Sequence, residues 1–174
     1  MKTTRGFLEN AQDRVYRQFA PHLEKALRDW LPRITTNRYT DASVDPISLN
    51  VKVKDPSGVF RDAHVLSQGT REQIYLLLRM ALVAFLTKPG EICPLIFDDV
   101  TVQTDGNRTE AVLNLLHEMC GTRQVIVFSQ EEDVRHWAEK NLVGKEHDKI
   151  IRLNGPVSGA CQPKLIEPQA NSSL

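Results

Sequence analysis

Two short stretches of the sequence carry residues that are suited to phosphate chemistry. Residues 66–69, Leu-Ser-Gln-Gly, form a glycine-containing turn that opens a stretch of helical periodicity. Residues 94–97, Pro-Leu-Ile-Phe, form a short apolar run that ends in the carboxylates Asp98 and Asp99. Unpaired N–H groups at a helix start attract anions, and carboxylates at a strand end can hold Mg²⁺ or activate water. These residue types therefore predict a site for the phosphates of a nucleotide.

The two acids are suited to different tasks. Asp98 can hold Mg²⁺, usually through its water shell, and Asp99 can orient or deprotonate an attacking water. If both residues were extended, their side chains would point to different faces of the sheet. Simpler interpretations stay open for both stretches. The acids can be two solvated carboxylates at a strand end, and the turn can be a helix that Ser67 caps and nothing more.

The elements that must position these residues follow from the spacing of the apolar side chains. The predicted helices are residues 5–31, the stretch from 70 to 87, residues 109–120 and a helix after residue 130. The predicted strands are residues 39–45, 48–54 with a continuation in 59–60, 94–97, 124–128 and 149–153. Pro21 is expected to break or kink the first helix, and Pro32 to stop it. The predicted fold is α/β, with a mostly parallel sheet, flanking helices and a small antiparallel unit.

The composition is that of an ordinary soluble globular domain. The 174 residues are 41% hydrophobic and 25% charged, with 22 basic and 22 acidic side chains. No apolar run approaches the ~20 residues of a membrane span, and the first residues lack the apolar core of a secretory signal. Three scattered cysteines predict neither a zinc site nor a disulfide framework. We therefore expect a cytoplasmic protein with no membrane partner.

The basic residues are concentrated near the N-terminus. Residues 1–40 hold eight Lys or Arg side chains and four acids. Such a segment can touch the phosphate backbone of DNA, or it can be the solvated face of a helix.

Four motifs, in order and with matching spacing, resemble those of ABC-type ATPases in the form used by the SMC-like branch. LSQGTREQ, residues 66–73, resembles the signature motif, and PLIFDD, residues 94–99, resembles the Walker B strand. Residues 101–105 resemble the D-loop. Residues 125–130, Val-Ile-Val-Phe-Ser-Gln, stand where that branch has a strand ending in a switch histidine. Residues 30–53 also resemble the segment before the signature in YhaN-like and SbcC-like ATPases.

The resemblance implies the C-terminal half of a P-loop ATPase head. The sequence contains no GKS or GKT loop, so the Walker A motif would come from an N-terminal lobe, in the same or a separate chain. Residues 1–31 would be a helical arm at the end of a coiled coil. Residues 32–154 would be the C-terminal ATPase lobe, and residues 155–174, rich in Pro, Gly, Ser and Gln, a flexible tail.

The resemblance also implies a role for each site residue, with ATP and Mg²⁺ as the cofactors. Asp98 would sit in the magnesium shell, and Asp99 takes the position of the general-base glutamate. Asp-Asp also occurs there in RecF-like and YhaN-like ATPases. Gln130 stands in place of the switch histidine and cannot carry positive charge, which favours slow hydrolysis. The other implied nucleotide-binding residues are Ser67, Gln68, Gly69 and Arg71 of the signature turn, and Asp105, which would act across a head dimer.

The leading hypothesis is a nucleotide-binding lobe of an SMC-like ATPase that works on DNA, in repair or defence. ATP would be hydrolysed only with a Walker A lobe and a second head, and a nuclease subunit is a further possible partner. The alternative is a catalytically weak interaction module that completes the ATP site of a partner subunit. A third interpretation, an unrelated small α/β domain, would make the four motifs a coincidence.

Overall fold

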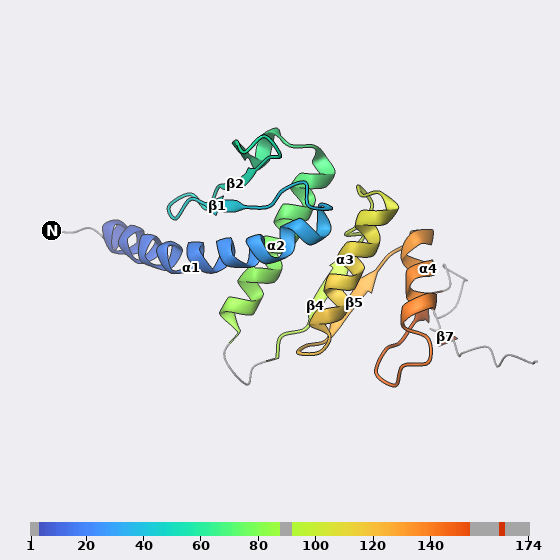
Figure 1. Cartoon of the computed structure of the whole chain (residues 1–174). Coiled ribbons are helices and arrows are strands. Elements are labelled where there is room, and N and C mark those ends of the chain that lie inside the picture. The colour runs from blue at the N-terminus through green and yellow to red at the C-terminus, as the bar shows by residue number, and fades with distance from the viewer. Residues whose placement is uncertain (1–3, 88–91, 154–163, 166–174) are drawn as a thin grey trace, which may run out of the picture. The chain divides into compact units, whose positions relative to one another are not determined.

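The computed structural model describes residues 4–87, 92–153 and 164–165, and the chain divides into two compact units, Met1–Phe128 and Ser129–Leu174. The predicted α/β fold is confirmed (Figure 1). The elements of the first unit are α1 (Thr4–Ile34), β1 (Ala42–Val44), β2 (Val51–Lys54), β3 (Phe60–Asp62), the 3-10 turn η1 (Ala63–Val65), α2 (Gln68–Leu86), β4 (Leu95–Asp98), α3 (Gly106–Met119) and β5 (Val125–Phe128). Within the described residues, no helix combines the length and the apolar character that crossing a membrane would require.

Helix α1 continues through both of its prolines. The break or kink expected at Pro21 does not end the helix, and the stop predicted at Pro32 is replaced by an end at Ile34. A proline inside a helix costs about 3 kcal/mol, because it removes a hydrogen bond and crowds the preceding turn. Leu23 and Leu27 are buried directly after Pro21, and each buried leucine contributes about 1.5–3 kcal/mol. The burial of the following turns therefore outweighs the local cost of the proline.

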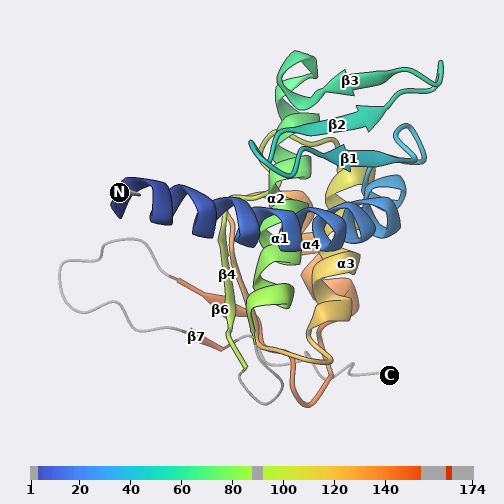
Figure 2. The same ribbon diagram turned by 90° about the vertical axis from the view of Figure 1, so that its left-hand side faces the viewer.

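The core of the first unit lies where α1 crosses α2 (Figure 2). Leu27 and Leu31 of α1 are fully buried, as are Ile74 and Leu77 of α2. Farther along the crossing, the rings of Phe19 and Phe85 meet edge to face, with their centroids 4.9 Å apart. This packing fixes the direction of α2, and hence the place of the turn at its start.

The small antiparallel unit is a three-stranded sheet in the order β1-β2-β3. Ala42 lies opposite Val53, and Lys54 lies opposite Phe60. The outer edge of β1 is closed by α1, because the Val44 N–H donates to a carboxylate oxygen of Glu24 at 2.8 Å. The strands are shorter than residues 39–45 and 48–54, which the alternation predicted.

Two aspartates hold the turns of this sheet. The Asp45 carboxylate accepts hydrogen bonds from the N–H groups of Ser48 and Ile47, which lowers the pKa of Asp45. The Asp55 carboxylate accepts from Ser57 and from Arg61, and these bonds hold the pKa of Asp55 far below its ordinary value. Both turns begin with an Asp-Pro dipeptide, a sequence that favours turns.

Strands β4 and β5 form a parallel pair, as predicted, with α3 as the crossover between them. Leu95 and Phe97 of β4 are buried against the core, whereas Ile96 on the opposite face is 64% exposed. Phe128 at the end of β5 is 46% exposed. Within the described residues of the first unit, this parallel sheet has only two strands, and one of its faces exposes apolar side chains.

The second unit contains α4 (Glu132–Asn141), β6 (Ile151–Arg152) and β7 (Lys164–Leu165). Helix α4 is the helix predicted after residue 130, and Glu132 and Asp133 in its first turn interact favourably with the helix dipole. The strand predicted over residues 149–153 is shorter, and it pairs antiparallel with β7, which was not predicted. Residues 155–163 and 166–174 of the expected tail lie outside the described residues.

Candidate functional site

The turn before α2 has an unusual cap. Ser67 stands at the N-cap position, but its hydroxyl makes no capping bond to the backbone and donates instead to the Thr70 hydroxyl at 2.9 Å. The Gln68 side chain turns away to bond Glu72 at 2.9 Å. Ser67 therefore does not cap the first turn of α2, and N–H groups at such a helix start can bind an anion.

Gly69 lies against the loop that follows β4. A Cβ atom built on Gly69 would lie 2.2 Å from the carbonyl oxygen of Gln103, so no larger residue fits without moving that loop. The close approach of the Gln103 carbonyl therefore explains why residue 69 is a glycine. It allows the start of α2 to pack directly on residues 101–105.

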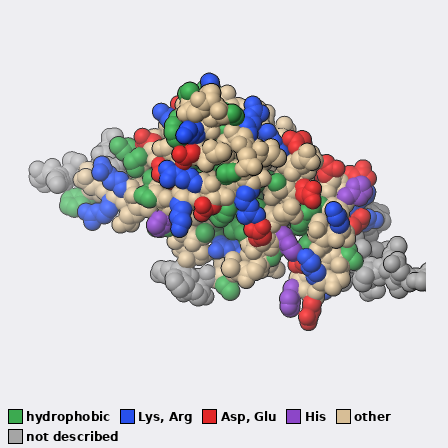
Figure 3. Space-filling model, viewed as in Figure 1, with side chains coloured by type: hydrophobic (Ala, Val, Ile, Leu, Met, Phe, Trp, Pro, Cys, Tyr) green, Lys and Arg blue, Asp and Glu red, His purple; other side chains and the backbone are tan. Residues whose placement is uncertain are grey.

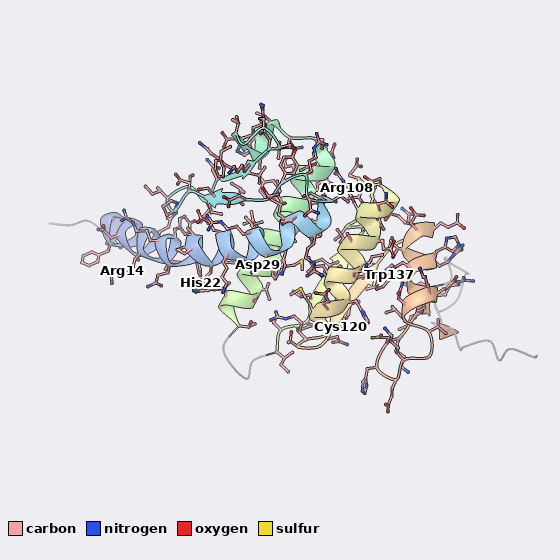
Figure 4. All side chains as sticks on the ribbon, in the orientation of Figure 1. Arg14, His22, Asp29, Arg108, Cys120 and Trp137 are labelled. Atoms are coloured by element: carbon pink, nitrogen blue, oxygen red, sulfur yellow. The ribbon has the colours of Figure 1, made fainter. Side chains whose placement is uncertain are left out.

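An arginine completes the contact between this turn and the loop. Arg108 lies at the start of α3, beside the start of α2 (Figure 4). Its Nη1 is 3.5 Å from the Thr70 hydroxyl, and its Nε is 3.3 Å from a carboxylate oxygen of Asp105. Asp105 also caps α3 by accepting from the Arg108 main-chain N–H at 3.1 Å. The structure thus brings together two of the predicted segments, the signature-like turn and the D-loop-like loop.

The sequence reasoning missed Thr70 and Arg108. Both looked like ordinary helix residues, because the contact between them spans 38 positions of the chain. One local signal for Arg108 was available. It stands three residues after Asp105, a spacing that favours an ion pair at the start of a helix.

The two acids lie at the end of β4, and both are exposed. Asp98 is extended and lies opposite Phe128 in the parallel pair. Asp99 donates its N–H to the Phe128 carbonyl at 3.0 Å but has a φ of 48°, in the left-handed region. The condition that both acids are extended is therefore not met at Asp99. The chain turns at this residue, so simple alternation across the strand does not set the direction of its side chain.

The remaining predicted residues are placed as follows. Arg71 lies in the first turn of α2, half-buried, and its N–H donates to the Ser67 carbonyl at 3.0 Å. Gln130 lies in the second unit and is exposed. Its neighbour Ser129 accepts a hydrogen bond from the Glu131 N–H at 3.1 Å. The role of Gln130 stays a prediction.

The acids at the end of β4 fit an Mg²⁺ site in which water and phosphate supply most of the ligands. No group of three or more His, Cys, Asp or Glu side chains suited to a metal ion occurs in the part of the chain that the structure describes. Mg²⁺ in phosphate-binding sites usually takes one or two carboxylates and fills its other positions with water and phosphate. The exposed Asp98 fits such a site, because it offers a carboxylate that still faces solvent.

One buried amide in α2 was not singled out from the sequence. Gln73 is 1% exposed, one turn after Thr70, and neither its side-chain nitrogen nor its oxygen has a hydrogen-bond partner in the structure. A buried polar group without a partner costs free energy, so this amide is a weak point of the core below the turn.

Comparison with known proteins shows which fold this chain has. No protein-family model matches the chain. The uncharacterized protein YhaN of Bacillus subtilis (strain 168) is 29% identical over 130 residues, which are 74% of this chain. The chain spans only 13% of the length of YhaN.

Solved structures share the fold more completely. One, from work on ATP-driven dimerization and DNA-stimulated activation of SMC ATPases, has a TM-score of 0.68 and 17% identity, and the match covers 91% of this chain and 89% of that one. A second, the SMC head bound to the C-winged helix domain of ScpA, has a TM-score of 0.64 and 16% identity, covering 86% of this chain and 43% of that one. The chain therefore has the fold of SMC ATPase heads, and the resemblance to the C-terminal lobe of such a head is confirmed.

Proposed function

We propose that this chain is the C-terminal nucleotide-binding lobe of an SMC-like ATPase that works on DNA. It would supply the signature turn and the Walker B-like strand to ATP sites that form when two heads meet. The observation that carries the proposal is the direct packing of Gly69 on Gln103. This contact joins an uncapped helix start to the loop that follows Asp98 and Asp99, within the fold of an SMC head.

The open parallel sheet supports the need for a second lobe. Parallel sheets are normally covered on both faces and rarely consist of two strands. Here the apolar side chains of Ile96 and Phe128 remain exposed on this pair of strands. Because the sequence has no GKS or GKT loop, the lobe that completes this sheet is also the one that would bring the Walker A motif.

Exposed apolar residues on α1 support its role as the end of a coiled-coil arm. Phe7 and Val15 are both exposed and lie eight residues apart, so they fall near the same side of the helix. Figure 1 shows this part of α1 without a neighbouring element of its own unit. If residues 1–31 are the end of a coiled coil, the other helix of that coiled coil would cover these side chains.

Different residues of this chain would carry out different parts of ATP hydrolysis. The Ser67 hydroxyl and the first N–H groups of α2 would bind the γ-phosphate of a nucleotide held by the opposing head. Asp99 would accept a proton from water as its oxygen attacks the γ-phosphorus, and the bond to the β–γ bridging oxygen would break to release ADP. Asp98 would hold Mg²⁺, which, when bound, offsets the charge of the β- and γ-phosphates. Gln130 would bond water or phosphate without adding charge.

DNA is proposed as the partner on which the heads act. Lys and Arg side chains lie along α1, interspersed with acids (Figure 3), and residues 1–40 hold twice as many basic as acidic side chains. The related SMC structure comes from work on DNA-stimulated activation. A cytoplasmic role in DNA repair, and a nuclease subunit as a further partner, belong to the same proposal.

ATP turnover by the full chain, alone and mixed with a matching Walker A lobe, tests the function. We expect activity only in the mixture, and a loss of about 100-fold or more in Asp99→Asn, which removes the proton acceptor. Asparagine tolerates a left-handed backbone, so this variant should fold normally. Asp29→Asn, at an exposed position of α1, is the matched control. Full activity in Asp99→Asn would contradict the assigned base.

One observation favours the alternative of an interaction module. Gln130 stands where the resemblance puts the switch histidine, and because glutamine cannot carry positive charge, this would weaken turnover. ATP-dependent association of the two lobes with no hydrolysis by the wild-type mixture would support this second function.

A further inference from the structure

The Thr70 hydroxyl is the meeting point of two donors. The Ser67 hydroxyl donates to it at 2.9 Å, an ordinary hydrogen bond, whereas Nη1 of Arg108 lies at the long limit of 3.5 Å. Thr70 is 1% exposed, so water does not compete for its oxygen. A threonine oxygen has two lone pairs and can accept from both donors.

Arg108 contacts both Thr70 at the start of α2 and Asp105 in the loop. Its side chain is only 17% exposed, while that of Asp105, with which it pairs, is 62% exposed. A guanidinium presents several donors in one rigid plane, so a single side chain can bond the loop acid and the helix hydroxyl together. The contact of Gly69 with Gln103 holds the same two segments at backbone level. A shift of the turn before α2 would therefore displace the loop of residues 101–105.

We propose that Thr70 and Arg108 couple the signature turn to the loop of residues 101–105, with Thr70 as a relay. When phosphate takes the Ser67 hydroxyl, Thr70 loses its nearer donor, and Arg108 closes the 3.5 Å gap to replace it. Because Arg108 is paired with Asp105, this movement pulls the loop acid toward α2. Arg108 is thus a positioning residue, not a catalytic one. The inference rests on the proposed function, since it takes nucleotide phosphate as the group that Ser67 binds.

The structural half of the coupling is tested on the full chain without nucleotide. Amide hydrogen exchange of residues 71–74, whose N–H groups bond the carbonyls of residues 67–70, is measured in wild type, Arg108→Gln and Thr70→Val. We expect faster exchange in both variants, because the first turn of α2 loses its tie to α3. Arg135→Gln is the control, since Arg135 pairs with Glu132 within α4. Exchange in Arg108→Gln equal to that of the control would overturn the proposal.

The nucleotide half is tested in the mixture with a Walker A lobe. Loss of one such bond should lower kcat about 5- to 10-fold in Arg108→Gln and in Thr70→Val, while the half-saturating ATP concentration changes less than about twofold. Arg108→Lys keeps the charge and should recover part of kcat. The double variant should be no slower than either single one, because both remove the same link. Losses that multiply would overturn the relay.

The two possible failures are distinguishable. A wild-type mixture that neither binds nor hydrolyses ATP overturns the proposed function, and with it the nucleotide half of the coupling. The exchange measurement still decides whether Arg108 holds the turn. A mixture that hydrolyses ATP equally well with and without Arg108 overturns the coupling alone.

Discussion

Asp99 occupies a position where the backbone restricts the choice of side chain. Its φ of 48° lies in the left-handed region, which disfavours most side chains and in which Asp and Asn are enriched. The short side chain of Asp tolerates this turn better than a longer one. The conformation gives a physical reason for an aspartate at this position. Nothing in the sequence indicated a positive φ here, because an apolar run followed by two acids is equally compatible with an extended end.

Gln73 gives the first prediction at the residue scale. Gln73→Met keeps the volume of the side chain and removes two buried polar atoms that have no partner. We expect the free energy of unfolding to rise by about 1–2 kcal/mol, measured by urea denaturation. Gln18→Met, at an exposed position of α1, should change it by less than about 0.5 kcal/mol. A less stable Gln73→Met chain would show that the amide is satisfied, for example by a buried water.

Local motifs predicted part of the candidate site. Ser67, Asp98 and Asp105 were found because their motifs are local in sequence. Thr70 and Arg108 were missed because their contact depends on how α2 packs beside the start of α3. Local motifs can be recognised without a fold, but a contact between residues 38 positions apart cannot.

At the element scale, apolar periodicity predicted α2, α3 and β4, since each buries one clear face, and an apolar run predicted β5, whose residues are half-buried or exposed. It failed where distant packing decided the outcome. Helix α1 passes Pro21 because its next turns are buried. The pairing of β6 with β7 was not predicted, because a two-residue strand carries no pattern that identifies its partner. Local propensity set the elements, and tertiary contacts set their ends and pairings.

An ion pair between α1 and α3 gives the prediction at this scale. The Arg33 guanidinium bonds the Glu118 carboxylate through two contacts, one of them 3.0 Å between Nη1 and Oε2. The hydrogen bonds from Arg33 lower the pKa of Glu118. A lowered carboxyl pKa stabilises the fold above the unfolded-state pKa, and this stabilisation is lost as the pH falls through the folded-state pKa.

Glu118→Gln should therefore reduce stability at pH 7 and leave it unchanged in acid. Both side chains are largely exposed, so we expect a loss of only about 0.5–1 kcal/mol at pH 7. The difference from wild type should disappear as the pH falls below the folded-state pKa of Glu118. Glu110→Gln, at an exposed position of the same helix, is the control for charge alone. A constant difference at all pH values, measured by thermal unfolding, would contradict the role of the pair.

At the scale of the whole molecule, the exposed face of the parallel sheet allows the stability of the lobe to be tested separately from its proposed association with a second lobe. Ile96 is 64% exposed on the face of β4 opposite the core, so it contributes little to the stability of the lobe itself. Ile47, in the turn between β1 and β2, is 59% exposed. The two isoleucines match in size and exposure, but only Ile96 lies on the sheet that a Walker A lobe would complete.

Ile96→Lys should consequently separate folding from association. The variant should unfold at nearly the same temperature as wild type, because the lysine replaces a side chain that already faces water. It should bind a matching Walker A lobe at least about 10-fold more weakly, since a charge would have to be buried in the completed sheet. Calorimetric titration of the two lobes measures this, with Ile47→Lys expected to bind like wild type. Equal binding by both variants would mean that the partner lobe does not cover this face, and that the exposed apolar side chains of β4 and β5 need another explanation.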